Sequence, residues 1–323
     1  MPSRTAALAT LVAVVVGVGL AATGCGLGAR RGTASPVVTA GTDGSISLPV
    51  GSSTQHLVVD GRDRSFRVYR PAAVTDTRSV PLVVMLHGGY GNADDAESDY
   101  GWDGQADAAG FVVAYPDGIG HAWDVGGGCC GTPGRDHIDD VAFITRMVSA
   151  IGHEVAVDPA RVYATGISNG GLMAYRLACD TDVFAAIGPD STTLMGACPT
   201  PAPLSVIHIH GLADDRIPFA GGRGTGFATV VDGLPVPSVI ALWRSADGCA
   251  TPTTSTAGVV TTSLATCRSG RAVELITIAG AGHQWPGGRS PGLVGRVIGL
   301  DPPSHALDAT STIWAFFAAH PRP

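Results

Sequence analysis

The stretch Arg161-Val-Tyr-Ala-Thr-Gly-Ile-Ser168-Asn-Gly-Gly-Leu172 decides how the rest of the chain is interpreted. Its first half contains β-branched and aromatic residues that favour a strand, and the residues that follow, 172–178, favour a helix. Between them stands the pattern Gly-x-Ser-x-Gly. A serine between a strand and a helix sits on a strained turn that needs small neighbours, and the two glycines supply them. The pattern therefore predicts a nucleophile elbow that carries Ser168.

Continuous apolar runs recur on both sides of this stretch, as is typical of strands buried on both faces of a parallel sheet. The predicted strands are 81–86, 111–115, 184–189, 204–210 and 272–279, with a hairpin over 55–70. The predicted helices are 99–109, 139–154, 238–246 and 304–319. Alternating strands and helices predict an α/β fold with a mostly parallel, doubly wound sheet and helices on both faces.

Composition sets the class of protein. A chain of 323 residues with 45% hydrophobic and 15% charged residues can bury a large core, which excludes an intrinsically disordered protein. The net charge is −7, and no basic run is present. We therefore expect no nucleic-acid partner, because such binding depends on clustered cations that neutralise phosphates.

The N-terminus predicts export. Arg4 is the only charged side chain before an apolar run, which ends at Thr23-Gly24-Cys25. The end of the run resembles a bacterial lipobox, in which the cysteine is lipidated. We therefore expect a lipoprotein signal peptide over 1–24, a flexible tether over 25–52, and a catalytic domain over 53–323. The predicted location is extracytoplasmic, with Cys25 lipid-anchored to the cell membrane; a plain secretory signal and an uncleaved anchor helix are the alternatives.

A serine nucleophile needs a base and an orienting acid, which in the α/β-hydrolase fold follow it in the order acid, then histidine. His283 directly follows the last predicted strand and is the candidate base. Asp214 follows the preceding strand and is the candidate acid, with Asp215 and Asp190 as alternatives. His208 and His210 lie on a strand and are interpreted as sheet or site-lining residues.

An oxyanion site needs backbone N–H groups aimed at the developing charge. One is expected from Asn169, directly after the serine, and the other from Gly89 or Tyr90, after the first parallel strand. His87 precedes the serine, so we interpret it as bracing this loop rather than as a base. His87, Trp123 and Trp285 are also candidate substrate-binding residues, since we expect both indoles at the rim of the sheet.

The cysteines suggest disulfides. Apart from Cys25 there are six, and an even number in an exported chain is typical of paired cysteines. Cys249 and Cys267 flank a polar excursion and are the predicted pair. The partners of Cys129, Cys130, Cys179 and Cys198 stay open, although adjacent Cys129 and Cys130 are not expected to bond to each other. Paired C-x-x-C spacing is absent, so we expect no metal, and Asp139-Asp140 is interpreted as a helix cap.

Six motifs together resemble the secreted polyhydroxybutyrate depolymerase and feruloyl esterase family, and most of all actinobacterial lipoprotein esterases. They are His87-Gly88-Gly89, Trp123 with Gly128-Cys129-Cys130-Gly131, residues 139–143, residues 166–171, His210-Gly211 to Asp214, and residues 282–287. The resemblance implies an α/β-hydrolase that hydrolyses carboxylic esters through an acyl-serine intermediate, with no cofactor. Its substrates would be feruloyl, acetyl or short-chain hydroxyalkanoate esters. The alternative is a non-catalytic envelope lipoprotein of the same fold that binds a glycan or polymer.

Overall fold

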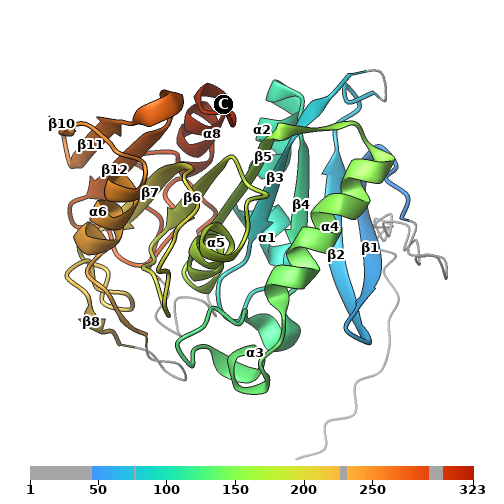
Figure 1. Cartoon of the computed structure of the whole chain (residues 1–323), viewed down its shortest axis with the longest axis horizontal. Helices are drawn as coiled ribbons and strands as arrows, with labels where there is room; N and C mark the ends of the chain where they lie inside the picture. Colours follow the sequence, from blue (N-terminus) through green and yellow to red (C-terminus); the bar gives the residue numbers. More distant parts are fainter. Residues whose placement is uncertain (1–45, 76–77, 226–230, 291–300) are drawn as a thin grey trace, which may run out of the picture. The chain divides into compact units, whose positions relative to one another are not determined.

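The computed structural model describes residues 46–75, 78–225, 231–290 and 301–323, whose ribbon is coloured along the chain in Figure 1. The strands are β1 (Gly51–Val59), β2 (Arg62–Arg70), β3 (Val80–Leu86), β4 (Val112–Pro116), β5 (Val157–Ile167), β6 (Ala186–Asp190), β7 (Ser205–Gly211), β8 (Gly222–Arg223), β9 (Asp232–Gly233), β10 (Thr253–Ala257), β11 (Val260–Thr266) and β12 (Ala272–Ile278). The α-helices are α1 (Ala93–Asp99), α2 (Trp102–Ala109), α3 (Gly131–Asp136), α4 (Asp140–Glu154), α5 (Asn169–Asp180), α6 (Val236–Ala246) and α8 (Ala309–Ala319). Short 3₁₀ turns lie at Ile119–His121 and Arg268–Gly270.

One large sheet organises these elements, in the order β1-β2-β4-β3-β5-β6-β7-β12-β11-β10. The strands from β4 to β12 in this order are parallel, and a two-stranded antiparallel ribbon extends each edge. Every residue of β3, β4, β6 and β7 is buried, which explains their continuous apolar sequences. β10 is exposed along its whole length and therefore tolerates a Thr/Ser-rich sequence.

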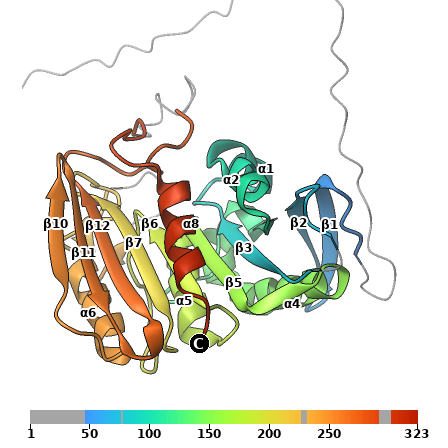
Figure 2. The same ribbon diagram turned by 90° about the horizontal axis from the view of Figure 1, so that it is seen from above.

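Helices cover both faces of the sheet, as predicted. The apolar sides of α4, α5 and α6 pack on one face, where Phe143, Leu172 and Trp243 are buried. The apolar sides of α1, α2 and α8 pack on the other, where Trp102 and Phe317 are buried. Figure 2 shows these two layers from above. Because the parallel strands all end at the same edge, the loops that follow them meet there.

The N-terminal half of the domain is tied together by a buried ion pair. Arg64 of β2 donates to Asp140 of α4 over 2.6 Å, and its guanidinium lies 3.9 Å from the centre of the Phe143 ring. Asp139 caps α4 by accepting the Ala142 N–H over 2.8 Å, which confirms the predicted cap. The adjacent Asp140 instead pairs with Arg64. Its burial requires this partner, since an unpaired carboxylate there would be costly.

The domain begins earlier than expected. Ile46 and Leu48 are 5% exposed and pack in the main core, so the tether predicted to reach residue 52 does not extend that far. The predicted signal peptide, 1–24, and Cys25 lie outside the described residues. Within the described ranges, none of the helices has both the length and the apolar character needed to cross a membrane.

Three disulfides are formed. Cys249–Cys267 joins the end of α6 to the end of β11 and confirms the predicted pair, and Cys179–Cys198 closes the segment after α5. The expectation that Cys129 and Cys130 do not bond to each other is wrong. Their Cα atoms lie 3.2 Å apart, which brings the two sulfurs together, and the other four cysteines are already paired.

Candidate active site

Ser168 occupies a strained turn between β5 and α5. Its backbone has φ 57° and ψ −121°, a conformation that residues other than glycine rarely adopt. A Cβ atom on Gly170 would lie 2.2 Å from the Leu86 carbonyl oxygen, and one on Gly166 would lie 2.7 Å from Gly170. Both positions therefore require glycine. The Ser168 side chain is partly exposed, as the predicted nucleophile elbow demands.

Asp214 and His283 lie beyond the ends of two neighbouring strands, β7 and β12, and form a hydrogen-bonded pair. The distance from His283 Nδ1 to Asp214 Oδ2 is 2.8 Å. The second carboxylate oxygen accepts the N–H groups of Arg216 and Ile217, each over 2.9 Å. Asp214 is 5% exposed and His283 is 9% exposed. A carboxylate acceptor requires the proton on Nδ1, so Nε2 of His283 is the nitrogen left to act as a base.

The charge state of Asp214 suits an orienting acid. Burial alone would raise the pKa of this carboxyl group, but the hydrogen bond and charge interaction with His283, together with smaller contributions that include the Ile217 N–H, outweigh it, and the pKa is lowered. Neither alternative acid is placed in this way. Asp215 is exposed, and Asp190 is fully buried, which raises its pKa well above the usual value. The structure therefore pairs His283 with Asp214.

The loop after β3 lies against the elbow. A Cβ atom on Gly88 would lie 3.6 Å from the Ser168 Cβ, and one on Gly89 would lie 3.9 Å from the Asn169 Cβ. The Tyr90 N–H already donates to the His121 carbonyl over 2.8 Å. Of the two backbone N–H groups predicted in this loop, that of Gly89 therefore stays the candidate second donor of the oxyanion site, beside the N–H of Asn169.

His87 braces this loop through both ring nitrogens. Nε2 accepts the Gly118 N–H over 2.9 Å, and Nδ1 lies 2.8 Å from the Gly88 carbonyl oxygen, to which it must donate. Burial lowers the pKa of His87, which favours this neutral form. The predicted bracing role fits these contacts. A substrate-binding role does not, because His87 is 1% exposed.

Trp123 is fully buried, so the expectation that it lines the rim is wrong. Its indole N–H donates to the His87 carbonyl over 2.9 Å, and the two rings lie 4.7 Å apart. Its backbone is held by the Asn169 side chain, whose Oδ1 accepts the Trp123 N–H over 2.7 Å and whose Nδ2 donates back to the Trp123 carbonyl over 3.3 Å. The residue after the serine thus has a structural side chain, a role that the sequence did not reveal.

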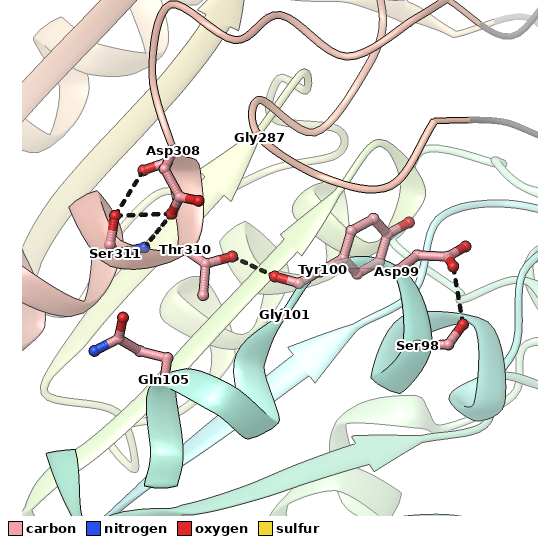
Figure 3. Close-up of a pocket in the computed structure, with 9 residues that line it drawn as sticks. All are labelled: Ser98, Asp99, Tyr100, Gly101, Gln105, Gly287, Asp308, Thr310 and Ser311. Carbon is pink, nitrogen blue, oxygen red and sulfur yellow. Dashed lines mark hydrogen bonds between the residues drawn. The ribbon is translucent and has the colours of Figure 1, made fainter. Parts of the chain in front are cut away.

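Trp285 is also buried, at 4% exposed, and the rim prediction is wrong for it as well. Its indole N–H donates to Thr310 Oγ1 over 3.0 Å, and its ring lies 5.1 Å from that of Tyr100. Thr310 and Tyr100 also line a polar pocket of about 450 Å³, shown in Figure 3. The pocket is lined by Ser98, Asp99, Tyr100, Gly101, Gln105, Gly287, Asp308, Thr310 and Ser311.

This pocket is separate from the candidate site, since Ser168, Asp214 and His283 do not line it. Several of its polar side chains already bond within it: Ser311 to Asp308, and Ser98 to Asp99, as Figure 3 shows. A metal centre finds no support either. Within the described part of the chain, no group of three or more His, Cys, Asp or Glu residues is arranged to hold an ion.

Comparison with known proteins adds the family. Residues 64–215 match the model of the family described as esterase PHB depolymerase. NocK of Nocardia uniformis subsp. tsuyamanensis, whose name assigns it to the esterases, is 34% identical over 273 residues, which cover 75% of this chain and 77% of the relative. The chain belongs to the PHB depolymerase esterase family. As a member of this family it is a carboxylic ester hydrolase.

A second relative is longer than this chain. Feruloyl esterase B of Piromyces equi is 31% identical over 230 residues, and the match spans 66% of this chain but only 41% of the relative. Among solved structures, the acetyl xylan esterase from Aspergillus awamori superimposes with a TM-score of 0.57 at 17% identity, covering 83% of this chain and 99% of that one. A thermostable esterase gives a TM-score of 0.53 at 15% identity, covering 83% of this chain and 63% of that one. These structural likenesses establish the α/β-hydrolase fold.

Proposed function

We propose that the protein is an exported serine esterase that hydrolyses carboxylic esters through an acyl-serine intermediate, with Ser168 as nucleophile, His283 as base and Asp214 as orienting acid. The observation that carries the proposal is the 2.8 Å contact between His283 Nδ1 and Asp214 Oδ2, formed at the sheet edge where β5 delivers Ser168. In the neutral imidazole this contact places the proton on Nδ1 and makes Nε2 the nitrogen with the free lone pair, which a general base needs.

The proposed reaction uses these groups in two halves. In the first, Ser168 Oγ attacks the ester carbonyl carbon while His283 Nε2 takes the hydroxyl proton, and the N–H groups of Asn169 and Gly89 stabilise the negative oxygen. Collapse breaks the bond to the alcohol, which leaves with the proton from His283. In the second half, water gives its proton to His283 and attacks the acyl-serine, releasing the acid and restoring Ser168. Asp214 stabilises the imidazolium in both halves.

The proposed substrates are feruloyl, acetyl or short-chain hydroxyalkanoate esters. Support comes from the relatives, which are named as feruloyl and acetylxylan esterases. Since Trp123 and Trp285 are buried, recognition of the acyl and alcohol groups falls to other residues near Ser168. A panel of methyl ferulate, acetylated xylan, p-nitrophenyl butyrate and polyhydroxybutyrate would rank these classes by kcat/KM.

The proposed location is outside the cytoplasm, with a lipid on Cys25. Three disulfides support export, because cytoplasmic thiols are kept reduced. The proposed division is a signal peptide over 1–24, a short tether, and a catalytic domain that contains the described residues from Ile46 onward. Mass spectrometry of the mature N-terminus tests the anchor. An unmodified Cys25 would contradict it.

The test of the function is Ser168→Ala, measured by p-nitrophenyl butyrate hydrolysis and by labelling with a fluorophosphonate probe. We expect a loss of roughly a million-fold in kcat and no labelling, since the nucleophile is gone. Ser98→Ala, at an exposed serine of α1, is the matched control and should keep both signals. A wild-type protein that neither hydrolyses esters nor takes up the probe would instead favour the non-catalytic envelope lipoprotein.

A further inference from the structure

Three buried rings form a hydrogen-bonded row that ends beside the acid loop. Tyr175 OH lies 2.7 Å from His208 Nδ1, and His208 Nε2 lies 3.1 Å from His210 Nδ1. His210 Nε2 then lies 2.9 Å from the Ile217 carbonyl oxygen. Tyr175, His208 and His210 are each 0% exposed. The two histidines share a face of β7 because side chains alternate along a strand.

The direction of the protons in this row follows from its ends. The Ile217 carbonyl only accepts, so His210 must donate from Nε2, and its Nδ1 is an acceptor when the ring is neutral. His208 must then donate from Nε2, which leaves its Nδ1 to accept the Tyr175 hydroxyl proton. Every hydrogen bond in the row is satisfied by one arrangement, in which both histidines are neutral and carry the proton on Nε2.

The charge states agree with this arrangement. Burial lowers the pKa of His210 to about 4 and that of His208 well below its usual value. His210 Nε2 lies 3.6 Å from Asp214 Oδ2, but because His210 is neutral this approach is not an ion pair. A ring with its Nε2 lone pair turned toward the Ile217 carbonyl and the Asp214 carboxylate would be repelled by both. The Ile217 carbonyl and the Asp214 carboxylate therefore fix the proton of His210 on Nε2.

The row ends on the peptide groups that hold the acid. The Ile217 carbonyl accepts from His210, while the Ile217 N–H donates to Asp214 Oδ1 over 2.9 Å. One residue therefore connects His210 to the turn that carries Asp214. Resting on the proposed triad, we propose that His210 is a positioning residue: its Nε2–H locks the 211–217 turn so that Asp214 faces His283, while His208 donates to Nδ1 and holds the ring in place.

Two substitutions at one position separate the two hydrogen bonds of His210. In His210→Asn the amide stands near the former Nδ1, so it can still accept from His208 but cannot reach Ile217. In His210→Gln the amide stands near the former Nε2, so it can still donate to Ile217 but leaves His208 without its acceptor. Each variant loses one buried hydrogen bond, so their melting temperatures should fall by similar amounts.

The proposal predicts different activities for these two variants, although we expect their melting temperatures to be similar. We expect His210→Asn to lose roughly 10- to 100-fold in kcat with KM unchanged, because a misplaced acid stabilises the imidazolium less well, and the imidazolium forms only in the transition state. His210→Gln should recover most of this loss and remain within about fivefold of wild type. His56→Asn, at a half-buried histidine of β1, is the matched control and should behave as wild type. Equal losses in the two His210 variants, or a wild-type kcat in His210→Asn, would overturn the proposal.

A substrate-free measurement keeps this test distinct from that of the proposed function. The proton between His283 and Asp214 gives a low-field signal in one-dimensional proton NMR, which needs no ester. We expect the signal in wild type and His210→Gln, and its loss or displacement in His210→Asn. An unchanged signal in His210→Asn contradicts the positioning role. If the wild-type protein hydrolyses no ester, the proposed function fails, and the NMR comparison still decides whether His210 orients Asp214.

Discussion

Ser168 donates its N–H to the carbonyl of Asp190 over 3.0 Å, and the carboxyl group of that same aspartate is fully buried. Neither carboxyl oxygen has a hydrogen-bond partner of ordinary geometry within the described part of the chain. Burial raises the pKa of Asp190 well above its usual value, which favours the protonated carboxyl group. The candidate nucleophile is therefore hydrogen-bonded to the backbone of a residue whose buried carboxyl group favours its neutral form.

Asp190→Asn should accordingly keep its activity. The amide has the shape and charge of the protonated acid, so we expect kcat within about threefold of wild type at pH 7. The initial rate of p-nitrophenyl butyrate hydrolysis measures this. A loss of several orders of magnitude would show that Asp190, and not Asp214, is the acid that His283 needs.

Asp214→Asn should have the opposite result. The amide cannot accept the His283 Nδ1 proton in the same way or stabilise the imidazolium, so we expect kcat to fall by about 10⁴-fold. Asp215→Asn changes the same group one residue later at an exposed position and is the control. The comparison requires only steady-state kinetics, and equal activity in the two variants would rule out Asp214 as the acid.

Trp123→Phe tests whether this residue supports the fold rather than the substrate. The change leaves the His87 carbonyl without its indole donor and shrinks a fully buried side chain, so we expect a loss of about 2 kcal/mol in the free energy of unfolding. The ratio of kcat/KM for methyl ferulate to that for p-nitrophenyl acetate should stay constant. A selective loss of ferulate hydrolysis would show that the indole contacts the substrate after all.

Asp103 should make the stability of the protein depend on pH. Burial raises its pKa from 3.8 to about 7, and its carboxyl group accepts the Tyr115 hydroxyl over 2.6 Å. The folded state therefore binds the proton more tightly than the unfolded state. Its contribution to stability is complete below the unfolded pKa and is lost as the pH rises through about 7.

Asp103→Asn should remove this dependence of the free energy of unfolding on pH, because the amide does not titrate. Urea unfolding of wild type and variant at pH 4, 6 and 8 measures the effect. The free energy of unfolding of the variant should increase relative to that of the wild type as the pH rises. Asp215→Asn again serves as the control. A constant difference between wild type and Asp103→Asn across these pH values would contradict the assigned pKa shift.

The sheet and the triad candidates could be predicted from sequence because each depends on local pattern and chain order. Apolar runs mark strands that are buried on both faces, and the positions of Ser168, Asp214 and His283 after successive strands place them at one edge. The predicted helix over 99–109 corresponds to α2, which begins only at Trp102 because Gly101 before it adopts φ 73°, and α1 was missed. The hairpin of β10 and β11 was missed, since its exposed Thr/Ser sequence lacks apolar alternation.

The errors concern features that depend on three-dimensional contacts. Trp123 is buried, and its backbone is held by the Asn169 side chain, which comes from a distant part of the sequence. Cys129 and Cys130 bond to each other, while Cys179 pairs with Cys198 and Cys249 with Cys267, and the count of cysteines alone left these pairings open. The row from Tyr175 to Ile217 joins α5, β7 and the acid loop, so spacing along the chain gave no sign of it.

The double hydrogen bond between the Asn169 side chain and the Trp123 backbone has a consequence for protein engineering. The backbone N–H of Asn169 is the proposed oxyanion donor, while the side-chain amide of the same residue holds the loop that follows β4. A loop transplanted from a relative to widen the ester range would therefore shift the donor too, unless it presents the same backbone N–H and carbonyl at position 123. Loop exchange in this enzyme should therefore preserve the backbone N–H and carbonyl at position 123 before new side chains are chosen.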